Sequence, residues 1–127
     1  IAHMQIEAIG IDILKKMVEN SVGNLKHYNL KGRVVKGDIE NIKNYDFKAI
    51  VTDPPYGLST TTKGEGVKEL MSRSMEIFTE TMKKEQRVVM AVSNPKLINP
   101  KDFTLMHKFE WYIHKSLTRY ILVLEKN

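Results

Sequence analysis

The sequence predicts an α/β fold, because short apolar runs of strand character alternate with amphipathic stretches of helical period. Strand and helix alternate three times up to residue 93, and two further β-rich runs close the chain. With 127 residues, 42% of them hydrophobic, the chain is long enough to bury one core and short for two. We therefore expect residues 1–127 to form one domain.

The first half of the chain predicts three strands and one helix. Residues 6–11 predict a short strand, and Asp12 follows it at the position of a helix N-cap. A helix that ends near Tyr28 and Asn29 is predicted by five apolar residues at helical spacing: Leu14, Met17, Val18, Val22 and Leu25. Residues 33–36 predict a second strand, and residues 47–52 a third that is apolar enough for burial on both faces.

The second half predicts a helix, a strand and a closing hairpin. Residues 67–82 predict an amphipathic helix, followed by a strand over residues 87–93. We expect a short helix around residues 101–107, and then two strands, 109–114 and 120–124, joined by residues 115–119. The glycine-containing segment 58–66 fits either a lid over a bound substrate or a plain flexible connection.

Composition narrows the class of protein. The net charge of +5 and the isoelectric point near 9.4 mildly favour a polyanionic partner. The absence of cysteine excludes a disulfide framework and a cysteine-ligated metal site. No apolar run approaches the roughly 18 residues that a membrane span needs. We therefore expect a cytoplasmic protein without a membrane partner.

Three aspartates stand at or near the ends of predicted strands. They are Asp12, Asp38 and Asp53, and each follows its strand directly or after one glycine. In open α/β sheets ligands collect at the carboxyl ends of parallel strands, so three parallel strands would place these carboxylates along one rim. Taken alone, Asp12 and Asp38 also fit a helix cap or a turn.

The third aspartate begins a stiff corner, Asp53-Pro54-Pro55-Tyr56. Two prolines fix their φ angles, push the preceding residues into extended backbone and offer carbonyls without N–H groups. A carboxylate beside a carbonyl can accept both hydrogens of an amino group. Tyr56 adds a flat face, and stacking on a base contributes about 1–3 kcal/mol. The corner predicts a holder for an extruded base with an exocyclic amine, although a tight turn with Tyr56 packed on a neighbour is the plain alternative.

Asp-Pro-Pro-Tyr after an apolar strand resembles the catalytic motif of the S-adenosylmethionine-dependent amino methyltransferases. Four segments, in this order and spacing, resemble the archaeal tRNA guanine-N2 methyltransferases that modify position 10: GIDILKKMVENSVGNL, GDIENI, AIVTDPPYG and HKSLTRYILVLEK. The resemblance implies a Rossmann-like class I methyltransferase sheet with an antiparallel C-terminal hairpin. It also implies S-adenosyl-L-methionine as cofactor, tRNA as partner and methylation of the guanine 2-amino group. A DNA adenine-N6 methyltransferase, and an inactive module that binds RNA or a partner protein, are the alternatives.

The same resemblance implies a role for individual residues. Asp12, with Ile13, would contact the ribose hydroxyls of the cofactor, and Asp38, with Ile39, would flank its adenine ring. Asp53, which also borders the cofactor, would hold the target amine together with Pro54 and Pro55, and Tyr56 would stack on the base. Four residues of the last hairpin would lie near the target: His114, Lys115, Ser116 and Arg119. No metal is implied.

One departure from the family is large. A glycine-rich loop normally stands about twenty residues before the acid at Asp12, whereas eleven residues precede Asp12 here, with the single glycine Gly10. We therefore expect a partial catalytic domain that lacks the first strand and the glycine-rich loop. We expect this chain alone to bind S-adenosylmethionine weakly or not at all. We also expect its sheet to be completed by an N-terminal segment or by a second copy, or to rearrange so that the gap closes.

Overall fold

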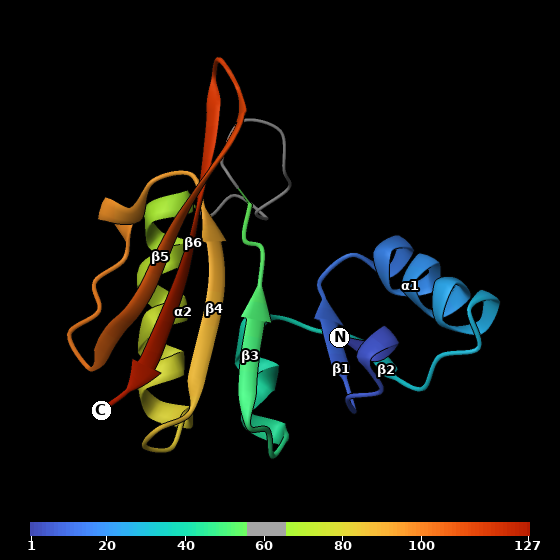
Figure 1. The fold of residues 1–127 in the computed structure, drawn as a ribbon. Coiled ribbons are helices and arrows are strands. Elements are labelled where there is room, and N and C mark those ends of the chain that lie inside the picture. Colours follow the sequence, from blue (N-terminus) through green and yellow to red (C-terminus); the bar gives the residue numbers. More distant parts are fainter. Residues whose placement is uncertain (56–65) are drawn as a thin grey trace. The chain divides into compact units, whose positions relative to one another are not determined.

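The computed structural model describes residues 1–55 and 66–127, which form two compact units, Ile1–Tyr45 and Asp46–Asn127 (Figure 1). Each unit has its own sheet, two-stranded in the first and four-stranded in the second. The expectation of a single domain stays a prediction. Within the described ranges, no helix combines the length and the apolar character needed to cross a membrane.

The first unit is a strand–helix–strand arrangement. Its strands pair in parallel, and Asp12 at the end of the first strand lies beside Lys36 at the end of the second. The predicted order of strand, helix and strand is confirmed. In chain order the elements are η1 (Ala2–Met4), β1 (Ile9–Asp12), α1 (Lys15–His27), β2 (Arg33–Lys36) and η2 (Ile39–Asn44).

The end of α1 is fixed by local backbone geometry. Asn29 adopts a left-handed conformation with φ of 50°, which asparagine tolerates better than most residues. The Asn29 N–H donates to the Lys26 carbonyl over 3.1 Å, and the Leu30 N–H donates to the Leu25 carbonyl over 2.8 Å. These two bonds satisfy carbonyls in the last turn that have no hydrogen-bond partner within the helix. The predicted end of the helix near Tyr28 and Asn29 is confirmed.

The second unit is a mixed sheet with one long helix. The strand order is β3-β4-β6-β5, with β3 parallel to β4 and the other neighbours antiparallel. The α/β class and the closing antiparallel hairpin are therefore confirmed. In chain order the elements are β3 (Ala49–Thr52), α2 (Val67–Thr81), β4 (Arg87–Val92), η3 (Pro95–Leu97), β5 (Phe103–His114) and β6 (Leu117–Lys126).

The core of the second unit lies between α2 and one face of the sheet (Figure 1). Side chains alternate between the two faces of a strand, so every second residue of β4 is buried. Val88, Met90 and Phe78 of α2 are fully buried. The expectation that β3 is buried on both faces is wrong, because β3 is an edge strand of its sheet and Val51 is 59% exposed.

The helix expected around residues 101–107 is also wrong. Lys101 and Asp102 form a turn, in which the Phe103 N–H donates to the Pro100 carbonyl over 2.8 Å, and β5 begins at Phe103. Long-range pairing with β6 overrides the local helical spacing of the apolar residues. The turn of the hairpin is also shorter than expected, because β5 ends at residue 114 and β6 begins at residue 117.

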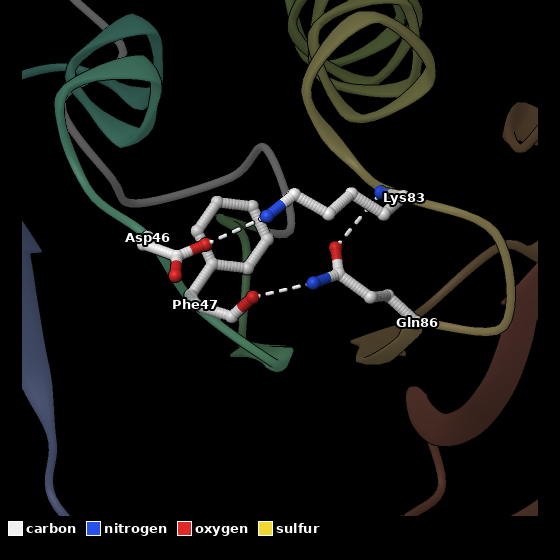
Figure 2. Close-up of polar contacts among 4 residues, drawn as sticks. All are labelled: Asp46, Phe47, Lys83 and Gln86. Carbon is white, nitrogen blue, oxygen red and sulfur yellow. Dashed lines mark hydrogen bonds and ion pairs between the residues drawn. The ribbon is translucent and has the colours of Figure 1, made fainter.

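A small polar cluster anchors the chain just before β3 (Figure 2). The Gln86 side-chain amide donates to the Phe47 carbonyl over 2.5 Å, and its oxygen accepts from the Lys83 backbone N–H over 2.9 Å. The Lys83 ammonium donates to the Asp46 carboxylate over 3.0 Å. The loop between α2 and β4 therefore holds the entry to β3 by two separate side-chain contacts.

Candidate active site

The predicted corner that begins at Asp53 follows the end of β3. The ladder between β3 and β4 ends at the pair Thr52 and Met90, and Asp53 comes directly after it. Pro54 and Pro55 are half-buried and have no N–H to extend the ladder. The Asp53 side chain is 55% exposed, so its carboxylate is open to an incoming group. Tyr56, and most of the segment 58–66 that could form a lid, lie outside the described residues.

Arg119 of β6 lies next to Asp53. Its Nη1 atom is 3.8 Å from Asp53 Oδ2, and its guanidinium carbon is 5.9 Å from the centre of the Trp111 ring on β5. Trp111 and Arg119 are direct cross-strand partners in the hairpin. Of the hairpin residues expected near the target, Arg119 is thus the one with a described ion pair to Asp53. Trp111 is not among the predicted site residues, although alternating aromatic residues on an edge strand are a signal for it.

The other three predicted hairpin residues lie at its tip. His114 is the last residue of β5, and its Nδ1 accepts from the Ser116 N–H over 3.3 Å. Lys115 and Ser116 form the turn. Because β4 pairs with β6 only from Tyr120 to Glu125, this tip extends beyond the end of β4, as Figure 1 shows.

In the first unit, Asp12 ends β1 instead of capping α1. The N-cap residue of α1 is Leu14, so the predicted cap position is wrong by two residues. Asp12 Oδ1 accepts from the Leu14 N–H over 2.8 Å, and the Asp12 carbonyl accepts from the Gly37 N–H over 2.9 Å. These bonds fix the direction of the carboxylate. Ile13, beside it, is half-buried.

Asp38 caps the short helix η2. It forms a capping box with Asn41, in which the Asp38 N–H donates to Asn41 Oδ1 over 2.7 Å. Ile39 is the first residue of η2 and is half-buried. The plain interpretation of Asp38 as a cap is confirmed, but a carboxylate has room for further donors.

Asp12 and Asp38 both stand at the carboxyl end of the β1–β2 pair. Asp53 belongs to the other compact unit, so a rim shared by all three aspartates stays a prediction. In the parts of the chain that are described, no group of three or more histidine, aspartate or glutamate residues is arranged to hold a metal ion.

Comparison with known proteins gives consistent findings. A family model described as the RMKL-like methyltransferase domain matches residues 2–114. A probable tRNA (guanine(10)-N2)-dimethyltransferase of Methanothermococcus thermolithotrophicus is 41% identical over 97% of this chain and 77% of its own length. The tRNA (guanine(10)-N2)-dimethyltransferase of Pyrococcus abyssi is 36% identical over 96% of this chain. The chain spans only 39% of that relative's length.

Solved structures share the fold. TrmN from Thermus thermophilus superposes with a TM-score of 0.76 at 18% identity, over 94% of this chain and 36% of that one. The Pyrococcus abyssi tRNA (uracil-54, C5)-methyltransferase, in complex with S-adenosyl-L-homocysteine, gives a TM-score of 0.72 at 15% identity over 97% of this chain and 30% of that one. These likenesses show the fold, a Rossmann-like α/β arrangement that this chain shares with both structures.

Proposed function

The chain belongs to the RMKL-like methyltransferase domain family, and on this premise we propose that it methylates the exocyclic 2-amino group of a guanine in tRNA. The names of its relatives support position 10 as the target. S-adenosyl-L-methionine is the cofactor, and the reaction would transfer its methyl group from sulfur to the guanine nitrogen, with release of S-adenosyl-L-homocysteine and of one proton from the amine. The polypeptide acts in the cytoplasm, where its tRNA substrate is found.

The observation that carries the proposal is the exposed carboxylate of Asp53 on a proline-stiffened corner after a parallel strand. The lone pair of the guanine amine is delocalised into the ring, which makes this nitrogen a poor nucleophile. The Asp53 carboxylate and the Pro54 carbonyl accept hydrogen bonds from the two N–H groups of this amine. These bonds favour a more pyramidal nitrogen as attack proceeds. These hydrogen bonds accelerate the reaction because they strengthen in the transition state. Pro55 stiffens the corner, and Tyr56 provides the stacking face.

The residues of the first unit suit the cofactor. Bound S-adenosylmethionine supplies a methyl group on a positively charged sulfur. Asp12 is held by the Leu14 N–H through one carboxylate oxygen, so its second oxygen can accept from ribose hydroxyls. Asp38 stands at the same end of the strand pair and accepts from the adenine amine. Ile13 and Ile39 are half-buried neighbours that give the ring and the ribose an apolar contact.

We also propose that both compact units belong to one catalytic domain, since the family match extends from residue 2 to residue 114. In this proposal the cofactor site takes further residues from a longer polypeptide or from a second copy. The hairpin tip also contributes to tRNA binding in this proposal, through His114, Lys115 and Ser116. An intact mass and an oligomeric state measured in solution distinguish the two sources of the additional residues.

The test is transfer of a labelled methyl group from S-adenosylmethionine to a tRNA transcript by the complete polypeptide that contains residues 1–127. We expect Asp53→Ala to lower turnover by about 10²–10⁴-fold while the fold is retained. Asp46→Ala is the matched control, because Asp46 precedes the same strand and is paired with an exposed lysine. More than about a tenth of wild-type turnover in Asp53→Ala would refute the role of this carboxylate. Methylation of an adenine-containing DNA duplex in place of tRNA would refute the proposed substrate.

A further inference from the structure

Strand β5 carries a row of three aromatic rings on the face of the sheet opposite α2. His107, Phe109 and Trp111 are spaced two residues apart, so their side chains point to the same face. Lys108, which lies between the first two, pairs with Leu122 of β6. Leu122 is buried on the face that α2 covers, which places the aromatic row on the other face.

The row is exposed and regular. Phe109 is 55% exposed and Trp111 is 54% exposed. The rings of His107 and Phe109 are stacked, with their centres 5.9 Å apart and their planes inclined by 24°. Positions two apart on a strand are separated by about 6.6–6.8 Å, which lets neighbouring rings meet successive bases of an extended nucleotide chain. Exposed aromatic rings in such number indicate a binding surface.

Positive charge lies beside the row. Arg119 pairs with Trp111 across the hairpin and shares its face, and Lys115 stands in the turn at the hairpin tip, whereas Lys108 and Glu110 lie on the other face. Glu110 is paired with Lys108 over 3.6 Å. The Arg119 guanidinium lies beside the Trp111 ring, so cation and aromatic face are presented together. This combination complements phosphates and bases of a nucleic acid better than it complements an apolar protein surface.

We propose that His107, Phe109 and Trp111 form a stacking platform for unpaired nucleotides of the RNA substrate. The rings stack on the bases, and the neighbouring cations attract the phosphates. The choice of RNA rests on the proposed function, whereas the platform itself rests on the geometry of the hairpin. The platform would hold nucleotides that flank the methylated one, because Arg119 connects Trp111 to Asp53.

The test uses the intrinsic fluorescence of Trp111, which is the single tryptophan of the chain. The 127-residue chain is titrated with an unstructured oligouridylate, without any methyl donor. We expect saturable quenching that weakens as salt rises. Phe109→Leu keeps an apolar side chain but removes the ring, and we expect it to weaken binding about fivefold or more. Tyr112→Ala is the matched control, since Tyr112 is an exposed aromatic residue of the same strand on the opposite face.

Absence of quenching would overturn the inference, as would equal losses of affinity in Phe109→Leu and Tyr112→Ala. Emission that changes with protein concentration alone would also overturn it, in favour of a second copy on this face. An unfolding curve verifies that each variant is folded, and His107→Leu replaces Phe109→Leu if the latter is not. Because the titration contains no methyl donor, it can succeed while methyl transfer to tRNA fails. It can equally fail while methyl transfer persists, so the two failures are distinguishable.

Discussion

The contact between Gln86 and Phe47 should contribute measurably to stability, because it holds the entry to β3 (Figure 2). The strand has four residues and lies at the edge of its sheet, so it has hydrogen-bonded neighbours on one side only. The proposed catalytic corner follows it directly. Replacing Gln86 by alanine removes the donor to the Phe47 carbonyl and the acceptor for the Lys83 N–H.

The magnitude follows from these two hydrogen bonds. A neutral hydrogen bond contributes about 0.5–1.5 kcal/mol to stability. The bond to Phe47 is partly buried, whereas the bond from Lys83 is exposed and water can replace it. We therefore expect Gln86→Ala to lower the free energy of unfolding by about 1–2 kcal/mol. Lys83→Ala removes an ion pair whose side chains are 73% and 88% exposed, and it should cost less than about 1 kcal/mol.

Urea denaturation measures both losses, and hydrogen exchange of the β3 amides locates them. Gln86→Glu is the informative third variant, because it keeps an acceptor for Lys83 but has no donor for Phe47. We expect it to be at least as destabilising as Gln86→Ala. Equal unfolding free energies of Gln86→Ala and Lys83→Ala, with unchanged exchange over Ala49–Thr52, would refute the role of this contact.

Two further substitutions test other parts of the fold. Gly37→Ala should destabilise the first unit by about 0.5–1.5 kcal/mol in urea denaturation, because a Cβ there would lie 2.5 Å from Asn41 Oδ1 and disturb the capping box with Asp38. A wild-type unfolding curve would contradict this. Met90→Ala should cost about 2–5 kcal/mol, since Met90 is fully buried, whereas Met106→Ala, at a residue 39% exposed, should cost much less. Similar melting temperatures for the last two variants would show that the core is assigned incorrectly.

Elements with a clear local period were predictable from the sequence. The helix of the second unit matches its predicted start at residue 67, and β2 matches residues 33–36 at both ends. The short helix around residues 101–107 failed because its apolar spacing fits a helix locally, while pairing with β6 makes it a strand. That pairing joins segments that are apart in the sequence, so the local pattern of apolar residues does not predict it.

The candidate site was predictable where it depends on one segment of chain. Asp53 was placed correctly at the end of its strand, because an apolar run followed by two prolines specifies both the strand and its end. The pairing of Trp111 with Arg119 could not be predicted from the sequence, because it depends on the register of the hairpin. A two-residue turn and an irregularity between Tyr112 and His114 set that register, and a shift by one residue would move every side chain to the other face.

The stiffness of the Asp53 corner comes mainly from covalent constraint. The ladder with β4 stops at Thr52, so strand pairing does not orient the carboxylate. Arg119 is 3.8 Å away, but Asp53 is 55% exposed, and such a pair contributes at most about 1 kcal/mol. The two prolines, by contrast, remove backbone freedom that would otherwise cost about 1–2 kcal/mol per residue to fix. Arg119 therefore selects a direction for the carboxylate on a corner whose backbone is already restricted before any substrate binds.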